Sequence, residues 1–172
     1  MGRTALIYGL PAGMVTIAII ILGLELSGGE GGASSQWFGY LTMFLALTAI
    51  FFGVKHYRDQ ERGGVIGFGQ ALLAGLAIAA SAGAAYVAVW EAYLAISGRD
   101  FITEYADKHI EAQIAAGVAG EELANLVASM EDLKRNLKNP LFRLPVTFTE
   151  IFPVGALISF VSAGILRRPA SA

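Results

Sequence analysis

Two glutamates, Glu91 and Glu150, lie within stretches that are otherwise apolar enough to cross a lipid bilayer. An ionisable side chain is costly in lipid, so by default it marks a functional site. Glu150 also lies three residues before Pro153, which has no N–H for the carbonyl of Thr149 and should kink a helix there. A carboxyl group beside a kink could exchange a proton, bind a cation or contact a lipid headgroup. Equally, it could be a buried, hydrogen-bonded group that fixes the kink.

The partners of these carboxyl groups can be proposed from position along the chain. Arg143 opens the last apolar segment, at the level of Glu91 if the third and fourth segments are antiparallel neighbours. A salt bridge between them, or hydrogen bonds from tyrosine or tryptophan to Glu91, would be a purely structural arrangement. Arg143 and Thr147 share approximately the helix face of Glu150. The candidate intramembrane polar site is therefore Glu91, Arg143, Thr147, Glu150 and Pro153, whereas Glu25 is interpreted as interfacial.

Motifs that carry enzyme chemistry are missing. There is no G-x-x-x-x-G-K-[ST] loop, no H-E-x-x-H and no serine in a nucleophile elbow. The chain has no cysteine, and its two histidines, His56 and His109, are interpreted as solvated groups, with pH sensing by His56 the alternative. The sequence therefore predicts no enzyme, no cofactor and no metal site, and a carboxylate-based enzyme is the exception left open. A net charge of −2 gives no reason to expect nucleic acid as a partner.

The composition is that of a membrane protein. Hydrophobic residues make up 55% of the 172 residues and charged residues 15%, against about 45–50% and about 25% in soluble domains. Four apolar segments, at about 4–26, 37–57, 68–96 and 144–166, reach the length of about 20 residues that spans a bilayer core. Because lipid cannot satisfy open backbone groups, each should be helical. We predict an all-α integral membrane protein with four transmembrane helices, the first an uncleaved span rather than a signal peptide.

Basic residues indicate the orientation of the spans. Four spans place both termini on one side, and short flanks on that side carry six cations close to span ends. The other six lie in the longer segment 97–143, where the positive-inside rule applies less strongly. We therefore expect cytoplasmic termini, a membrane-spanning domain over the whole chain, and a flexible Gly/Ser-rich turn at 27–35. Lys55, Arg58 and Arg62, between the second and third spans, should meet anionic lipid headgroups.

The segment 97–143 has the pattern of a helical hairpin outside the membrane. A helix-forming stretch from Asp100 ends at "GVAG", and a second one, "EELANLVASMEDLKRNLK", ends at Asn139 and Pro140. The second helix carries an apolar stripe at helical spacing: Leu123, Leu126, Val127, Met130, Leu133 and Leu137. This stripe should pack on the first helix or the spans. The membrane surface and another protein are the alternatives.

Small residues recur at four-residue spacing within the predicted spans. Such stripes allow close approach of two helix backbones. They indicate packing among the four helices, with homodimerisation as the alternative. The stripes are Gly9 and Gly13 in the first span; Gly75, Ala79 and Gly83 in the third; and Gly155, Ser159 and Ala163 in the fourth.

Several phrases of the sequence together resemble a known family. They are "FFGVKHYRD", "GFGQAL", "YVAVWEAY" and "NPLFRLPVTFTEIFPVG", with "ISFVSAGILRR" near the end. In their order and spacing they are similar to a bacterial membrane-protein family defined as a domain of unknown function, number 4199. The likeness covers nearly the whole chain, and its most specific block contains Glu150. The resemblance implies a four-helix protein of the bacterial inner membrane and supplies no activity.

Three functions fit these observations. The first is a non-enzymatic accessory or scaffold subunit that contacts a larger membrane complex, external proteins or a second copy of itself. The second is a small oligomeric ion- or proton-linked transport protein that uses Glu91 and Glu150. The third is a lipid-binding protein with a site at the outer interface near Glu150 and Arg143. Small size, the missing catalytic motifs and the amphipathic hairpin favour the first.

Overall fold

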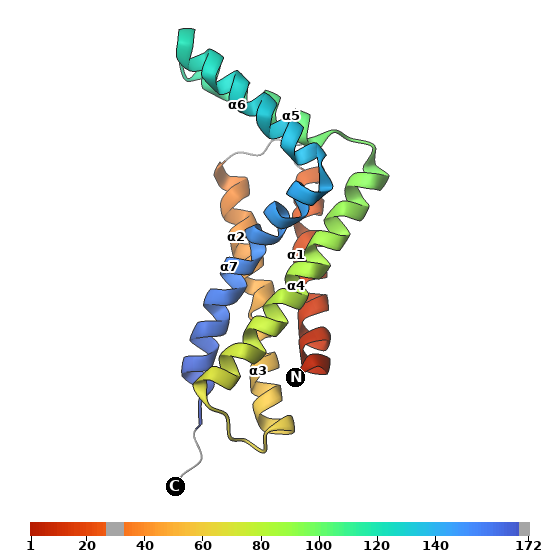
Figure 1. Cartoon of the computed structure of the whole chain (residues 1–172), viewed down its shortest axis with the longest axis vertical. Helices are drawn as coiled ribbons and strands as arrows, with labels where there is room; N and C mark the ends of the chain where they lie inside the picture. Colours follow the sequence, from red (N-terminus) through yellow and green to blue (C-terminus); the bar gives the residue numbers. More distant parts are fainter. Residues whose placement is uncertain (27–32, 169–172) are drawn as a thin grey trace. The chain divides into compact units, whose positions relative to one another are not determined.

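The computed structural model of the chain describes residues 1–26 and 33–168. Across these ranges the regular structure is helical apart from one isolated bridge between Ile66 and Arg168. The predicted Gly/Ser-rich turn lies mainly outside the described residues. The helices (Figure 1) are α1 (Gly2–Leu26), α2 (Ala33–Leu47), α3 (Ala49–His56), a π-helical segment (Tyr57–Glu61), α4 (Phe68–Ser97), α5 (Phe101–Ala115), α6 (Gly120–Lys138) and α7 (Pro140–Leu166).

Four helical stretches of the described chain are long and apolar enough to cross a membrane. They are Gly2–Leu26, Trp37–Glu61, Phe68–Ser97 and Pro140–Leu166. The all-α class and the four spans predicted from the sequence are therefore confirmed, and the chain is a multi-pass membrane protein. The helical hairpin that the sequence predicts between the third and fourth spans is present as α5 and α6.

The chain divides into two compact units, which are described separately. The first, called the bundle, comprises residues 1–90 and 148–172. The second, called the hairpin unit, comprises Glu91–Thr147. It is wider than the predicted insert 97–143, because the last residues of α4 and the first of α7 belong to it.

Backbone-to-backbone contact joins α1 to α4 in the bundle. A Cβ atom added to Gly9 would lie 2.5 Å from the carbonyl oxygen of Ile78, and one added to Gly13 would meet the carbonyl of Ala82. Both glycines are buried. The first small-residue stripe predicted from the sequence is therefore occupied by α4 of the same chain.

The contact of α4 with α7 uses the other predicted stripes. Gly75 lies against Ser159, where an added Cβ would come within 2.7 Å of the serine Cβ, and Gly155 lies against Ala79. The buried hydroxyl of Ser159 donates to the carbonyl of Gly155 at 2.7 Å, so its polarity is satisfied within α7. Because α1 and α7 contact different residues of α4, α4 is shared by both helix pairs.

The second span is interrupted at Thr48, between α2 and α3. The Thr48 hydroxyl donates to the carbonyl of Leu45 at 2.6 Å, a back-bonding pattern that often bends helices. The helical conformation then continues past the predicted end at residue 57, through the π-helical segment Tyr57–Glu61. This span is therefore longer than its apolar run alone predicts.

Arg58 is buried within this π-helical extension. Its side chain is only 8% exposed, and it donates to Asp59 at 2.6 Å and to the carbonyl of Leu166 at 3.4 Å. Leu166 is the last residue of α7, where a cation interacts favourably with unpaired carbonyls. The guanidinium thus bonds within the protein, in contrast to the lipid contact expected from the sequence, whereas Lys55 and Arg62 are exposed.

In the hairpin unit, α5 and α6 run side by side (Figure 1). Lys134 of α6 donates to Asp107 of α5 at 2.9 Å. This carboxylate, followed by that of Glu131, raises the pKa of Lys134. The leucines of the predicted α6 stripe are half-buried, and Val127 is 38% exposed. Within α6, all of which the structure describes, no side chain is fully buried.

Candidate functional site

Glu150 of α7 meets Tyr86 of α4 in the bundle. The hydroxyl of Tyr86 donates to Oε2 of Glu150 at 3.3 Å. The two side chains differ in exposure: Tyr86 is 4% exposed, whereas Glu150 is exposed on the surface of the bundle. The helices that carry them approach closely nearby, where Phe148 fills the space beside Gly83. Glu150 is thus a surface carboxyl group held by one buried phenol.

The surroundings of Glu150 along α7 are apolar. Pro153 and Leu157, three and seven residues further along, follow the same face and are exposed, Leu157 by 62%. Ile151, the next residue, is 1% exposed and belongs to the core. The carboxyl group therefore interrupts an exposed apolar surface of a helix that can span a membrane.

Pro153 lies inside α7 and does not interrupt this helix. The helix α7 continues from Pro140 to Leu166, so this proline does not end it. A kink at Pro153 would therefore change the direction of α7 without ending the helix, and this kink stays a prediction. Pro153 has no N–H to donate to the carbonyl of Thr149. Thr149 nevertheless takes part in another interaction.

Glu91 and Arg143 form an ion pair in the hairpin unit. Nε of Arg143 donates to Oε1 of Glu91 at 2.7 Å, and Nη2 donates to Oε2. The remaining nitrogen, Nη1, donates to the carbonyl of Leu137 at 3.1 Å. The exposed fractions are 17% for Arg143 and 25% for Glu91. This two-point geometry is the strong form of a carboxylate–guanidinium contact, and it is the structural arrangement that the sequence offered for Glu91.

The predicted polar site thus falls into two groups. Glu150 and Pro153 belong to the bundle, whereas Glu91, Arg143 and Thr147 belong to the hairpin unit. Thr147 is 5% exposed. The structure joins Glu91 to Arg143 and adds Tyr86 to Glu150, a partner that sequence reasoning missed. One sequence feature could have pointed to Tyr86, because this residue begins the family-like phrase "YVAVWEAY".

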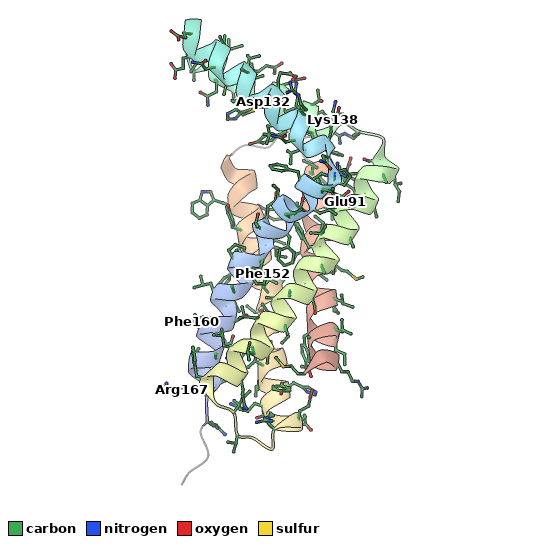
Figure 2. The ribbon with its side chains drawn as sticks, viewed as in Figure 1. Glu91, Asp132, Lys138, Phe152, Phe160 and Arg167 are labelled. Carbon is green, nitrogen blue, oxygen red and sulfur yellow. The ribbon has the colours of Figure 1, made fainter. Side chains whose placement is uncertain are left out.

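A cavity of about 460 Å³ also lies in the hairpin unit. Its charged lining residues are Glu91, Arg99, Asp100, Lys138 and Arg143, and its apolar ones include Leu94, Ala95 and Phe101. Figure 2 shows Glu91 on α4 and Lys138 at the end of α6. The sequence could not reveal this cavity, because its walls come from four helix ends that meet only in the fold.

Two charged groups of the cavity are anchored by α5. Asp100 precedes the helix and accepts from the hydroxyl of Thr103 at 2.8 Å and from its amide at 3.1 Å. These bonds lower the pKa of the Asp100 carboxyl below its usual value of 3.8. Arg99 pairs with Glu104 at 2.7 Å and lies over the ring of Phe101 at 4.5 Å. Asp100 is thus an N-cap of the kind that stabilises the start of a helix.

Each of the two histidines lies against a tyrosine. The ring of His56 is 5.7 Å from that of Tyr8, and the ring of His109 stacks on Tyr105 at 6.1 Å. Glu25 is exposed. Their interpretation as solvated or interfacial groups stays a prediction.

A family model decides the family of the chain. The model described as "Protein of unknown function (DUF4199)" matches residues 5–168. The chain belongs to this family. The match confirms the resemblance drawn from the sequence phrases, and it covers Tyr86, Glu91, Arg143 and Glu150. Neither the curated proteins nor the solved structures give a match.

Proposed function

We propose that this DUF4199 protein is a non-enzymatic accessory subunit of a larger assembly in the bacterial inner membrane. Both termini are cytoplasmic, and the hairpin unit lies on the outer side. A second membrane protein covers the face of α7 that carries Glu150. Four spans and the family match support the membrane part of this proposal. The exposure of Glu150 supports the part that concerns a partner protein.

The exposure of Glu150 is the observation that carries the proposal. A carboxyl group on the lipid-facing surface of a span is costly, and such groups usually face a protein interior or a polar partner. Tyr86 supplies one donor at 3.3 Å, but the side chain remains exposed. A partner helix with a lysine, arginine, asparagine or glutamine at this level would remove the cost.

The small-residue stripes support a partner at α7 by exclusion. Gly13 and Gly155 would be suitable for a helix from another chain, but α4 of the same chain already occupies both positions. A homo-oligomer built on these glycines would have to displace α4. The exposed face around Glu150 and Leu157 stays available to a partner.

Photo-crosslinking in native membranes tests the proposal. A photoreactive residue at Leu157, 62% exposed, probes the proposed face, and one at Leu22 of α1, 58% exposed, is the matched control. We expect Leu157 to label a distinct protein, Leu22 not to label it, and Glu150→Leu to abolish the product. Labelling of lipid alone from Leu157, unchanged by Glu150→Leu, would contradict the proposal. A crosslink to a second copy of this chain would indicate a homo-oligomer in place of an accessory subunit.

Ion- or proton-linked transport is the second candidate, and the Tyr86–Glu150 contact favours it. Tyr86 could hold the protonated or the ionised form of the carboxyl group. Glu91 is less suitable as a carrier, because Arg143 neutralises it at two points. Glu150→Gln separates the two functions: a lost pH-dependent flux in proteoliposomes with an intact crosslink at Leu157 would favour transport.

A further inference from the structure

We propose that the cavity of the hairpin unit binds the headgroup phosphate of an anionic phospholipid, with Lys138 as its cationic contact. This inference stands apart from the proposed partner at Glu150, because it concerns the other unit and different residues. It rests on the charges of the cavity wall, on their existing partners and on the helix ends that form the wall.

The wall of the cavity carries charged groups of both signs. Three cations, Arg99, Lys138 and Arg143, face two carboxylates, Glu91 and Asp100. Glu91 and Arg143 compensate each other through their two-point contact. Arg99 is likewise paired with Glu104. Among the described residues, Lys138 is then the cation of the wall that bonds to no carboxylate, and its complement would be an anion.

Lys138 differs from the other two cations in its bonds. Arg143 is committed to Glu91, and Arg99 to Glu104. Over the ranges that the structure describes, the ammonium of Lys138 takes part in no hydrogen bond, although its charge contributes to the lowered pKa of Asp100. Asp100 already accepts two bonds from Thr103. Lys138 can thus turn to a ligand without breaking a bond within the protein.

The cavity has a suitable size for a headgroup. At about 460 Å³ it falls within the range of about 300–1,000 Å³ that small-ligand sites occupy. Lysine contacts phosphate as a point charge and does not require planar two-point geometry. One lysine at an open cavity therefore suits a phosphodiester, which carries one negative charge.

The position of the wall in the chain selects a lipid as the source of that phosphate. The span α4 ends at Ser97, and the span α7 begins at Pro140. Span ends lie at the level of lipid headgroups. Leu94 and Ala95 line the cavity, and the neighbouring residues Ile96 and Leu141 are 84% and 82% exposed. An acyl chain can follow these exposed apolar side chains while its phosphate meets Lys138.

Lipid retention by the full-length protein tests this inference. The protein is purified in neutral detergent and mixed with equal amounts of phosphatidylglycerol and phosphatidylcholine, and bound lipid is counted by native mass spectrometry. We expect the wild type to retain phosphatidylglycerol preferentially and Lys138→Gln to lower that preference about fivefold, the effect of about one interfacial cation. Lys138→Arg should keep it.

Two variants and one competitor complete the experiment. Lys108→Gln removes the same charge from α5, outside the cavity wall, and should leave the preference unchanged. Ala95→Trp fills the cavity without changing charge and should lower it. Equal losses from Lys138→Gln and Lys108→Gln would overturn the inference. So would an unchanged preference in Ala95→Trp, or displacement of the lipid by inorganic phosphate at equal concentration, which would indicate a site for the free anion.

Discussion

The interactions that stabilise the bundle differ from those that stabilise the hairpin unit. In the bundle, large side chains such as Ile17, Leu47 and Ile50 are fully buried, and helices meet through glycine. In the hairpin unit, Ala106 is the buried residue of α5, α6 has none, and the links between elements include the ion pairs of Lys134 with Asp107 and of Arg143 with Glu91. Close packing drives helix association in lipid, and the buried contacts of the bundle are of this kind.

This difference has a consequence for stability. Contacts between backbones tolerate no added atom, whereas exposed ion pairs contribute little each and weaken with salt. Regions with few buried contacts open locally before the rest of a protein unfolds. The bundle should therefore unfold as one unit, and the hairpin unit should open first.

The largest expected effect is that of Gly13→Ala in the bundle. The added methyl group would meet the carbonyl of Ala82, which belongs to the backbone and cannot rotate away. We expect a loss of about 3 kcal/mol in the free energy of unfolding, measured in mixed micelles with increasing SDS. The matched control is Gly164→Ala in α7, where an added Cβ meets nothing within 4 Å. It should be neutral or stabilising, and equal losses in both variants would show that glycine flexibility, not the helix contact, matters.

The second effect is that of breaking the Glu91–Arg143 pair. Glu91→Gln or Arg143→Gln leaves the other charge half-buried, and we expect each to destabilise the hairpin unit by about 2 kcal/mol. The double variant should cost less than the sum, because neither charge is then unpaired. Hydrogen exchange of α6 amides measures the opening of this unit. Strict additivity would contradict a direct interaction between the two side chains.

The smallest effect is that of the N-cap of α5. Asp100→Ala should cost about 1 kcal/mol and speed hydrogen exchange in the first turn of α5 only. Because the folded pKa of Asp100 lies below 3.8, its ionised form favours the folded state. This contribution is complete above the unfolded value and is lost as the pH falls below it. Asp100→Asn, which keeps a capping oxygen but has no charge, should show a flatter pH dependence below pH 4.

The helices could be read from the sequence because their signals are local. Apolar runs gave the four spans, and the break at Gly117 and the stop at Pro140 gave the hairpin. The ion pair of Glu91 with Arg143 was one of the two arrangements expected for Glu91, on the condition that the third and fourth spans are antiparallel neighbours. In each case, spacing along the chain is enough to place the group.

The rest depends on which helices meet, which the sequence does not state. Arg58 looks like an interfacial cation until Leu166 is known to lie beside it. Glu150 looks like a buried group, but the fold places it on the exposed side of α7 with Tyr86 below it. Lys138 joins Arg99 in one cavity wall only because α6 ends where α5 begins.

The sharing of α4 between α1 and α7 also sets an order of events during synthesis. The ribosome completes α1, α2 and α3 before α4 exists, and α1 can meet α2 and α3 at once. Its glycine face, with Gly9 and Gly13, must wait for Ile78 and Ala82 to enter the membrane. Until then this face is covered by lipid or by the insertion machinery, so the nascent chain passes through a stage with two spans, before α4 arrives.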